Sequence, residues 1–155
     1  MKILFIVFGC MLALLLLYFL MIMPRILYRP DMSRFTRWLY AHRGLHDAKA
    51  GIPENSMAAF RKAVEAGFGI ELDVQISRDS VPVVFHDFTL ERMCGASGKV
   101  CDYSYEELQQ FRLAGTGERI PAFAEVLQLV DGQTPLIVEL KIERTDMTVC
   151  REVDR

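Results

Sequence analysis

Two acidic residues, Glu71 and Asp73, alternate with apolar residues in the stretch IELDVQIS. Period-two alternation predicts a β-strand, so both carboxylates leave the same face of that strand. Glu139 and Lys141 repeat this spacing within VELK later in the chain. A bare buried carboxylate is costly, so such acids face solvent, form ion pairs or bind a metal ion. The three carboxylates together suit a hard divalent cation such as Ca²⁺ or Mg²⁺.

Two of the three histidines, His42 and His86, close short apolar runs that predict strands. Imidazole titrates near neutral pH, so two histidines across a site can serve as general base and general acid. Arg43, beside His42, offers a planar guanidinium suited to a phosphate, and Lys141 adds a second cation. Because metal ligands, cations and two proton-transfer groups occur together, the set indicates cleavage of a phosphate ester.

These residues must be held in place by an alternation of strands and helices. We expect strands over residues 38–44, 69–77, 81–87 and 134–143, and helices over residues 53–67 and 121–132. Residues 90–119 are expected to form an inserted excursion with a short acidic helix, and a further helix is expected to begin within residues 144–155. Such alternation predicts parallel strands, and ligand sites in parallel sheets lie beyond the carboxyl ends of the strands.

Helix 53–67 carries its own boundary signals. Asn55 or Ser56 is a suitable N-cap, since both side chains can accept a hydrogen bond from the first turn. Gly67 closes the helix, because glycine readily adopts the left-handed conformation found just after a helix end.

The first residues of the chain predict a membrane anchor. Residues 3–23 hold no charge, and a helix of that length crosses a hydrocarbon core of about 30 Å. A signal peptide is the rival interpretation, but its apolar region usually spans about 7–15 residues and ends at small residues. A buried core helix is the other alternative, although core helices rarely lack polar positions over such a length. We therefore expect an uncleaved anchor over residues 1–23.

The flanking charges predict the orientation of this anchor in the cell membrane. Only Lys2 and the amino terminus precede the apolar segment, whereas four arginines and Asp31 lie within the basic linker expected over residues 24–37. By the positive-inside rule the soluble domain then lies in the cytoplasm. The linker is either a solvated flank of the anchor or a segment that contacts anionic lipid head groups.

Composition limits the remaining classes. The net charge of −2 offers no basic field for nucleic acid. The chain has no cluster of His and Cys at zinc-site spacing, which argues against a structural zinc site. Cys94, Cys101 and Cys150 are an odd set outside the apolar segment, so reduced thiols are expected; Cys94 and Cys101 could pair if the domain faced outside.

One long stretch of the chain resembles the glycerophosphodiester phosphodiesterase family. It runs from about Ala41 to Lys141 and contains, in order, AHRG, PENSMAAFRKAVEAGFGIELDVQISRDSVPVVFHDFTLERMCGASGKVCDYSYEEL, IPAFAEVL and LIVELK. Spider-venom-type phospholipases D share part of this pattern on a related barrel, but the PEN segment and the residues around His86 favour the phosphodiesterases. The resemblance implies a (β/α)₈ TIM-barrel fold and hydrolysis of glycerophosphodiesters to glycerol 3-phosphate and an alcohol.

The resemblance also implies roles for particular residues. His42 and His86 match the acid–base pair of the family. Glu71, Asp73 and Glu139 match its ligands for a divalent cation, commonly Ca²⁺ or Mg²⁺. In the implied mechanism a glycerol hydroxyl attacks phosphorus with proton transfer through one histidine, the other protonates the leaving alcohol, and water then opens a cyclic phosphate.

Three further residues match positions of the family's site. The turn before the third strand departs from the family pattern. Arg43 and Lys141 match the phosphate-contacting residues, and Asn55 matches the asparagine of the PEN motif beside the site. The Asp-Gly turn usual before the third strand reads Asp79-Ser80 here. Serine is less favourable than glycine where a turn needs positive φ, but this change does not touch the chemistry.

The length of the chain creates a second departure. A TIM barrel typically needs about 250 residues, so residues 38–155 are expected to form a partial domain with about the first four β/α units, as a truncated product or a fragment. The open edges of a half barrel could let two copies self-associate. The alternatives to the hydrolase are a non-catalytic, membrane-anchored remnant or interaction module, and a lyase of the phospholipase D type acting on choline lipids.

Overall fold

The protein is described by a computed structural model that covers residues 2–23 and 30–142. Contacts divide the chain into two units, Met1–Arg34 and Phe35–Arg155. Residues 24–29 of the predicted linker lie outside the described residues, as do the helix expected within residues 144–155 and Cys150.

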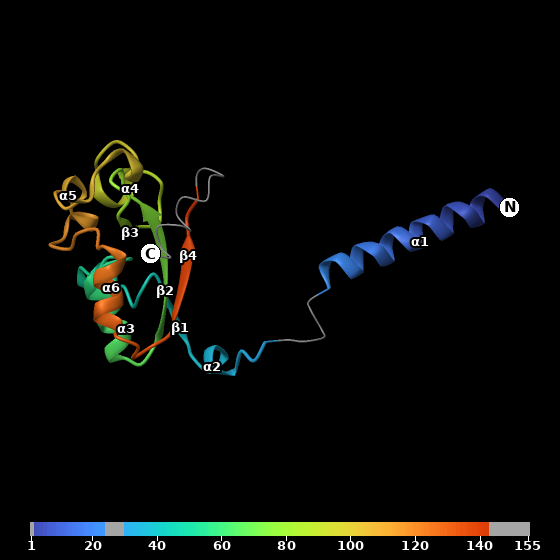
Figure 1. Cartoon of the computed structure of the whole chain (residues 1–155), viewed down its shortest axis with the longest axis horizontal. Coiled ribbons are helices and arrows are strands. Elements are labelled where there is room, and N and C mark those ends of the chain that lie inside the picture. Colours follow the sequence, from blue (N-terminus) through green and yellow to red (C-terminus); the bar gives the residue numbers. More distant parts are fainter. Residues whose placement is uncertain (1, 24–29, 143–155) are drawn as a thin grey trace. The chain divides into compact units, whose positions relative to one another are not determined.

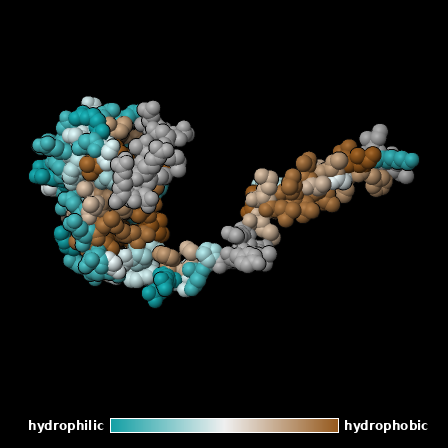
Figure 2. Space-filling view, viewed as in Figure 1, coloured by the Kyte–Doolittle hydropathy of each residue, from teal (hydrophilic) through white to brown (hydrophobic). Residues whose placement is uncertain are grey.

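The first unit contains one long apolar helix. Helix α1 (Lys2–Ile22) is continuous over 21 residues, and its apolar side chains form the brown rod of Figure 2. Its stretch Leu4–Ile22 is long and apolar enough to cross a membrane, and none of it is buried against protein. A signal sequence near an N-terminus meets the same criteria. The predicted helix is therefore confirmed, and its role as an anchor stays a prediction.

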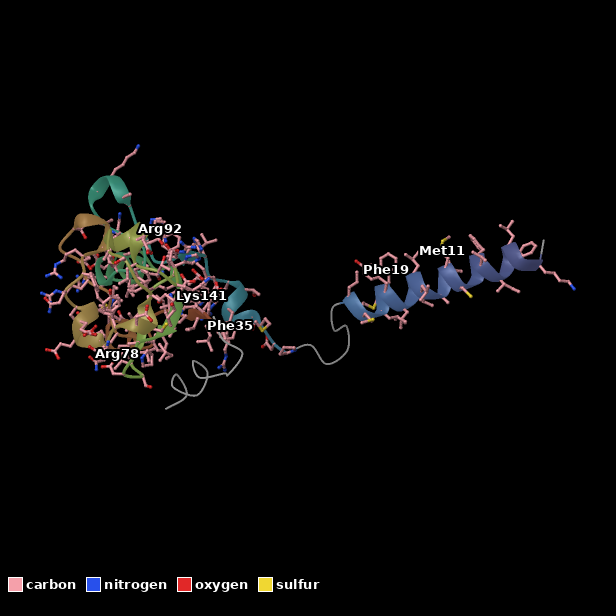
Figure 3. The ribbon with its side chains drawn as sticks, turned by 90° about the horizontal axis from the view of Figure 1, so that it is seen from above. Met11, Phe19, Phe35, Arg78, Arg92 and Lys141 are labelled. Atoms are coloured by element: carbon pink, nitrogen blue, oxygen red, sulfur yellow. The ribbon has the colours of Figure 1, made fainter. Side chains whose placement is uncertain are left out.

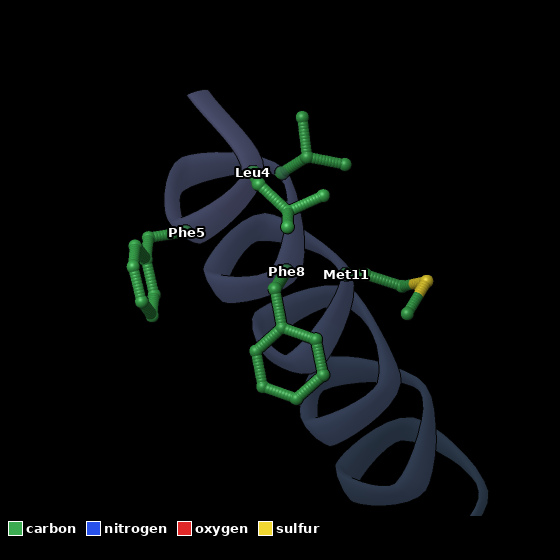
Figure 4. A pocket seen from close by; sticks show the side chains of 5 residues that line it. Leu4, Phe5, Phe8 and Met11 are labelled. Carbon is green, nitrogen blue, oxygen red and sulfur yellow. The ribbon is translucent and has the colours of Figure 1, made fainter. Parts of the chain in front are cut away.

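A shallow hollow runs along one side of α1. Figure 4 shows Leu4, Phe5, Phe8 and Met11 around it, and Val7 completes the lining. All five side chains are apolar, so the hollow offers no group that could bind a polar ligand or take part in catalysis. A surface of this kind suits contact with lipid acyl chains.

The second unit is built on a four-stranded sheet around β2 (Gly69–Ile76). Strands β1 (Tyr40–His42) and β4 (Leu136–Leu140) both pair with β2 in parallel. Helices α3 (Met57–Glu65) and α6 (Phe123–Val130) lie on one face of this sheet (Figure 1). Every predicted strand and helix of this region is found, with bounds shorter by a few residues.

The alternation in β2 separates an apolar face from a polar one. Ile70, Leu72 and Val74 are fully buried in the core that also contains helix residues such as Phe60 and Val126. The opposite face carries Glu71, Asp73 and Gln75, and the last two are buried as well. The polar face of this strand therefore does not simply face water, which makes the partners of its acids the central question.

The third predicted strand corrects the expectation of four parallel β/α units. Strand β3 (Pro82–Val84) pairs antiparallel to β2, with Val74 opposite Val84. Only a tight turn separates the two strands, and a parallel pair would require a crossover of a dozen or more residues. In the described residues the parallel strands are therefore β1, β2 and β4, and β2 with β3 forms a hairpin.

The 90–119 excursion is confirmed as a small separate layer. It contains α4 (Glu91–Cys94), α5 (Tyr105–Leu108) and the 3₁₀ turns η2 (Val100–Asp102) and η3 (Leu113–Gly115). Its buried side chains form a second apolar cluster with Phe85 and Val83 from the end of the hairpin.

The other short elements are α2 (Ser33–Thr36) and η1 (Ala48–Ala50).

Local signals explain where α3 begins and ends. Ser56 is the N-cap: its Oγ accepts a hydrogen bond from the Ala59 amide at 3.1 Å and donates to the Pro53 carbonyl at 2.7 Å. Gly67 follows the helix with φ 71°, as expected for a helix stop. The cap places the residues just before α3, including Asn55, at a fixed point beside the sheet.

The hairpin turn holds Ser80 in a left-handed conformation. Its φ is 63°, and its amide donates to the Ser77 carbonyl at 3.1 Å. Ser77 also accepts from the Val81 amide through Oγ at 2.9 Å, which closes the turn. A type I turn followed by a left-handed residue is a common hairpin connection, and glycine is favoured at its last position.

We predict that Ser80→Gly stabilises the folded domain. Relief of left-handed strain, about 1–2 kcal/mol, exceeds the entropic cost of glycine, so a net gain of about 0.5–1 kcal/mol is expected in the free energy of unfolding. Chemical denaturation of the full chain measures this gain. Ser97→Gly is the control, since Ser97 is not among the positive-φ residues, and it should be neutral or destabilising. A Ser80→Gly chain less stable than wild type would contradict this prediction.

Candidate active site

The predicted site residues other than His86 meet at the carboxyl-terminal edge of the parallel strands. His42 ends β1 and is paired in register with Glu71 of β2. Asp73 of β2 is paired in register with Glu139 of β4. Because the three strands run in the same direction, residues that are far apart in the sequence meet at one end of the sheet.

Three carboxylates form a compact acidic cluster at this edge. One oxygen each from Glu71, Asp73 and Glu139 lies within 4.8 Å of the others. The Asp73 side chain is 1% exposed, whereas that of Glu139 is 54% exposed. The cluster therefore extends from a buried carboxylate to the surface, as a site that exchanges a ligand with solvent requires.

The buried Asp73 carboxylate is surrounded by cations and one amide. Lys141 Nζ lies 3.1 Å from Asp73 Oδ1, and Arg43 Nε lies 3.6 Å from Oδ2. Asn55 Nδ2 donates a hydrogen bond to Oδ2 at 2.9 Å. A buried carboxylate is tolerated only when such partners offset its lost hydration. The sequence-predicted phosphate-contacting residues thus lie against the predicted metal ligand.

Lys141 connects the buried and exposed ends of the cluster. Its ammonium donates to Glu139 Oε1 at 2.6 Å while facing Asp73. Burial alone would lower the pKa of Lys141, but its interactions with Glu139 and Asp73 outweigh this effect and raise the pKa above its usual value. Lys141 therefore stays charged beside the acidic cluster.

The turn after β1 is strained. Arg43 and Asn55 both adopt positive φ, 56° and 51°, although non-glycine residues avoid this region at a cost of about 1–2 kcal/mol each. The Arg43 amide donates to Glu71 Oε2 at 3.1 Å, and the Asn55 amide donates to the Arg43 carbonyl at 2.9 Å. Gly44 must be glycine, because a Cβ there would meet Ala59 Cβ at 2.9 Å. Both of these strained residues contact the acidic cluster, Arg43 through Glu71 and Asp73 and Asn55 through Asp73.

The two predicted histidines differ in their surroundings. His42 is open to solvent, with Nε2 3.9 Å from Glu71 Oε2. His86 follows β3 and is partly buried, with Nδ1 2.6 Å from Asp87 Oδ1. Gln75 Nε2 donates to the carbonyls of Phe85 and Asp87 at 2.8 and 2.6 Å, which fixes the backbone around His86 against β2.

Sequence reasoning missed several residues that complete this arrangement. Glu54 accepts from Arg43 Nη1 at 2.9 Å, and Arg92 ion-pairs with both Glu54 and Asp87. Glu54 and Asp87 belong to the PEN and HD motifs and could have been singled out from them. Arg92 lies in the excursion, and no spacing pattern pointed to it.

The oxygen-rich donor set fits a hard divalent cation. Within the described part of the chain, Asn55 Oδ1 is buried without a hydrogen-bond partner, and so is Asp73 Oδ1 apart from its ion pair with Lys141. Carboxylate and amide oxygens are preferred by Ca²⁺ and Mg²⁺. The arrangement offers a cation site, cationic contacts for an anion and two groups that can transfer protons.

Comparison with known proteins agrees with this geometry. The model of the glycerophosphoryl diester phosphodiesterase family matches residues 42–155. A glycerophosphodiester phosphodiesterase from Caldanaerobacter subterraneus is 42% identical over 110 residues, which cover 66% of this chain and 44% of that protein.

Solved structures show the same fold relationship. A phosphodiesterase from Oleispira antarctica, solved with the product sn-glycerol-3-phosphate, matches with a TM-score of 0.67 at 27% identity over 77% of this chain and 52% of that chain. A glycerophosphoryl diester phosphodiesterase from Parabacteroides distasonis matches with a TM-score of 0.64 at 36% identity, over 76% of this chain and 42% of that chain.

This chain spans about half the length of the relatives that it matches. Its α/β sheet, in which β1, β2 and β4 are parallel, corresponds to part of the TIM-barrel structures of those relatives. The order of the motifs, the strand-edge cluster and these similarities agree with one another. The chain belongs to the glycerophosphodiester phosphodiesterase family.

Proposed function

We propose that the protein hydrolyses glycerophosphodiesters to glycerol 3-phosphate and an alcohol with the help of a divalent cation. The observation that supports this most is the meeting of Glu71, Asp73 and Glu139 with two cationic side chains at one strand edge. The Oleispira antarctica relative was solved with sn-glycerol-3-phosphate, which supports the same product class for this chain.

Glu71, Asp73 and Glu139 would hold Ca²⁺ or Mg²⁺, with Asn55 beside them. Such a cation, when bound, neutralises negative charge that develops on the phosphoryl oxygens. Arg43 and Lys141 contact the phosphate of the substrate, and their position against Asp73 orients them toward the same point. Arg43 offers a planar fork for two phosphate oxygens, and Lys141 offers a compact point charge.

His42 and His86 transfer the protons. One of them accepts the proton of a glycerol hydroxyl as that hydroxyl attacks phosphorus, and the other gives a proton to the leaving alcohol oxygen. The resulting cyclic phosphate is opened by water with the two roles reversed. His86 is suited to this work because Asp87 holds its Nδ1 and leaves Nε2 available.

In this proposal α1 anchors the protein in the cell membrane. Residues 1–23 form the anchor, residues 24–37 the basic linker and residues 38–155 the partial catalytic domain, which lies in the cytoplasm. The length of the apolar helix and the arginines that follow it support this arrangement. Self-association through the open strand edges stays a prediction.

We predict that His42→Ala and His86→Ala each lower kcat by about 10²–10⁴-fold, the usual contribution of a positioned proton-transfer group. Release of glycerol 3-phosphate from glycerophosphodiesters by the purified full chain with Ca²⁺ or Mg²⁺ measures this. His46→Ala is the matched control, because His46 is the third histidine and is exposed in the loop before η1.

Three results of that assay would overturn the proposal. Wild-type rates in both histidine variants would exclude the acid–base pair. A cyclic phosphate as the final product from choline lipids would favour the lyase. Lack of turnover by the wild-type chain, with or without metal, would favour the non-catalytic remnant.

We also predict that Ca²⁺ or Mg²⁺ stabilises the folded chain through the acidic cluster. A cation present at 100 times its Kd adds about 2.7 kcal/mol to the free energy of unfolding, which thermal unfolding detects as a higher Tm. Glu71→Gln with Glu139→Gln should abolish this shift. Glu65→Gln with Glu106→Gln changes the net charge equally at exposed positions and should retain it; equal shifts in both variants would exclude the cluster as the cation site.

A further inference from the structure

Arg92 lies in α4 of the excursion, but its guanidinium ion-pairs with two acids at the edge of the candidate active site. Its Nε and Nη2 reach the two oxygens of Asp87 at 2.5 and 3.0 Å, an arrangement with one donor for each oxygen. The same Nη2 reaches Glu54 Oε1 at 2.7 Å. Arg92 thus joins residues that are 5 and 38 positions away in the sequence.

Each of these two acids also holds a residue of the proposed mechanism. Glu54 Oε1 accepts from Arg43 Nη1 at 2.9 Å. Asp87 Oδ1 lies 2.6 Å from His86 Nδ1. Arg92 therefore connects the turn after β1, which carries the phosphate-contacting arginine, with the turn after β3, which carries one proton-transfer group.

The negative charge of Asp87 determines which ring nitrogen of His86 carries the proton. Hydrogen bonds from Arg92 and His86 outweigh the effect of burial and hold the pKa of Asp87 at about 2, so Asp87 is a carboxylate at neutral pH. An ionised carboxylate only accepts hydrogen bonds, so His86 must carry its proton on Nδ1. Nε2 of a neutral His86 is then the free position for proton transfer.

We propose that Arg92 is a positioning residue for the reaction: by fixing Asp87 and Glu54 it sets the tautomer and orientation of His86 and the orientation of Arg43. This inference rests on the proposed function, in which those two residues act on the substrate. The excursion would then help to assemble the site through Arg92, a residue that the sequence motifs did not point to.

Arg78 is an exposed, ion-paired arginine comparable to Arg92, but its ion pair does not involve a residue of the proposed mechanism. Arg78, also beside the excursion, is 56% exposed, and Arg92 is 48% exposed. Arg78 pairs with Glu107 at 2.8 Å and donates to the Asp102 carbonyl at 2.8 Å. Exposed pairs of this kind add at most about 1 kcal/mol. Figure 3 shows the two arginines at well-separated places of the second unit, which makes Arg78 a matched control.

The kinetic test compares Arg92→Gln, Arg92→Lys and Arg78→Gln in the full chain. Arg92→Gln should lower kcat by about 10²-fold, a loss that misplacing a catalytic group by about 1 Å can cause. Arg92→Lys should recover only part of this loss, because an ammonium cannot serve both oxygens of Asp87 and Glu54 at once. Arg78→Gln should keep wild-type kcat and KM. Equal losses in Arg92→Gln and Arg78→Gln, or a kcat within twofold of wild type for Arg92→Gln, would overturn the proposal.

A second measurement follows His86 directly and does not need turnover. In ¹⁵N-histidine-labelled protein in detergent micelles, the His86 signals, assigned with His86→Ala, should show Nδ1–H in the wild-type chain and in Arg78→Gln. Arg92→Gln should raise the fraction of His86 with its proton on Nε2, because Asp87 is no longer held against Nδ1. An unchanged His86 spectrum in Arg92→Gln would contradict the inference. Should Arg92→Gln fail to fold, Arg92→Lys replaces it in both measurements and should show a partial effect.

The two measurements separate the inference from the proposed function. If the wild-type chain shows no turnover, the proposed function fails, but the His86 spectra still decide whether Arg92 sets the tautomer. If the wild-type chain turns over and the His86 spectrum is unaffected by Arg92→Gln, the proposed function stands and the positioning role of Arg92 fails.

Discussion

The burial of the Asp73 carboxylate is the constraint on which the rest of the site depends. A carboxylate that is 1% exposed must be neutralised by its neighbours, and those neighbours are Lys141, Arg43 and Asn55. Each comes from a different part of the sheet edge. The need to neutralise one side chain therefore draws together β2, β4 and the strained turn after β1, and it concentrates both cations at one point.

The same arrangement is costly for stability. An ion-paired cluster costs desolvation that hydrophobic packing would not, and positive φ at Arg43 and Asn55 adds strain. Costs of this kind are common at sites where charges act on a ligand. A divalent cation and an anionic phosphate would complete the balance of charge around Asp73, Glu71 and Glu139, which is the chemistry that the family membership indicates.

Much of this could be predicted from the sequence, and the gaps have physical reasons. Period-two alternation placed Glu71 and Asp73 on one strand face. Cap chemistry narrowed the N-cap of α3 to Asn55 or Ser56, and the structure selects Ser56. Periodicity carries no information on strand direction, so β3 was taken as a parallel strand although a short turn before it demands a hairpin. Arg92 was missed because contacts between residues 38 positions apart have no local pattern.

The most direct test of the account is the turnover of a glycerophosphodiester by the purified full chain as Ca²⁺ or Mg²⁺ is titrated, compared with that of the isosteric double variant Glu71→Gln with Asp73→Asn. The account predicts that glycerol 3-phosphate release by the wild-type chain rises with the cation and saturates, and that the double variant releases none above background. Cation-dependent release by the double variant at the wild-type rate would contradict it.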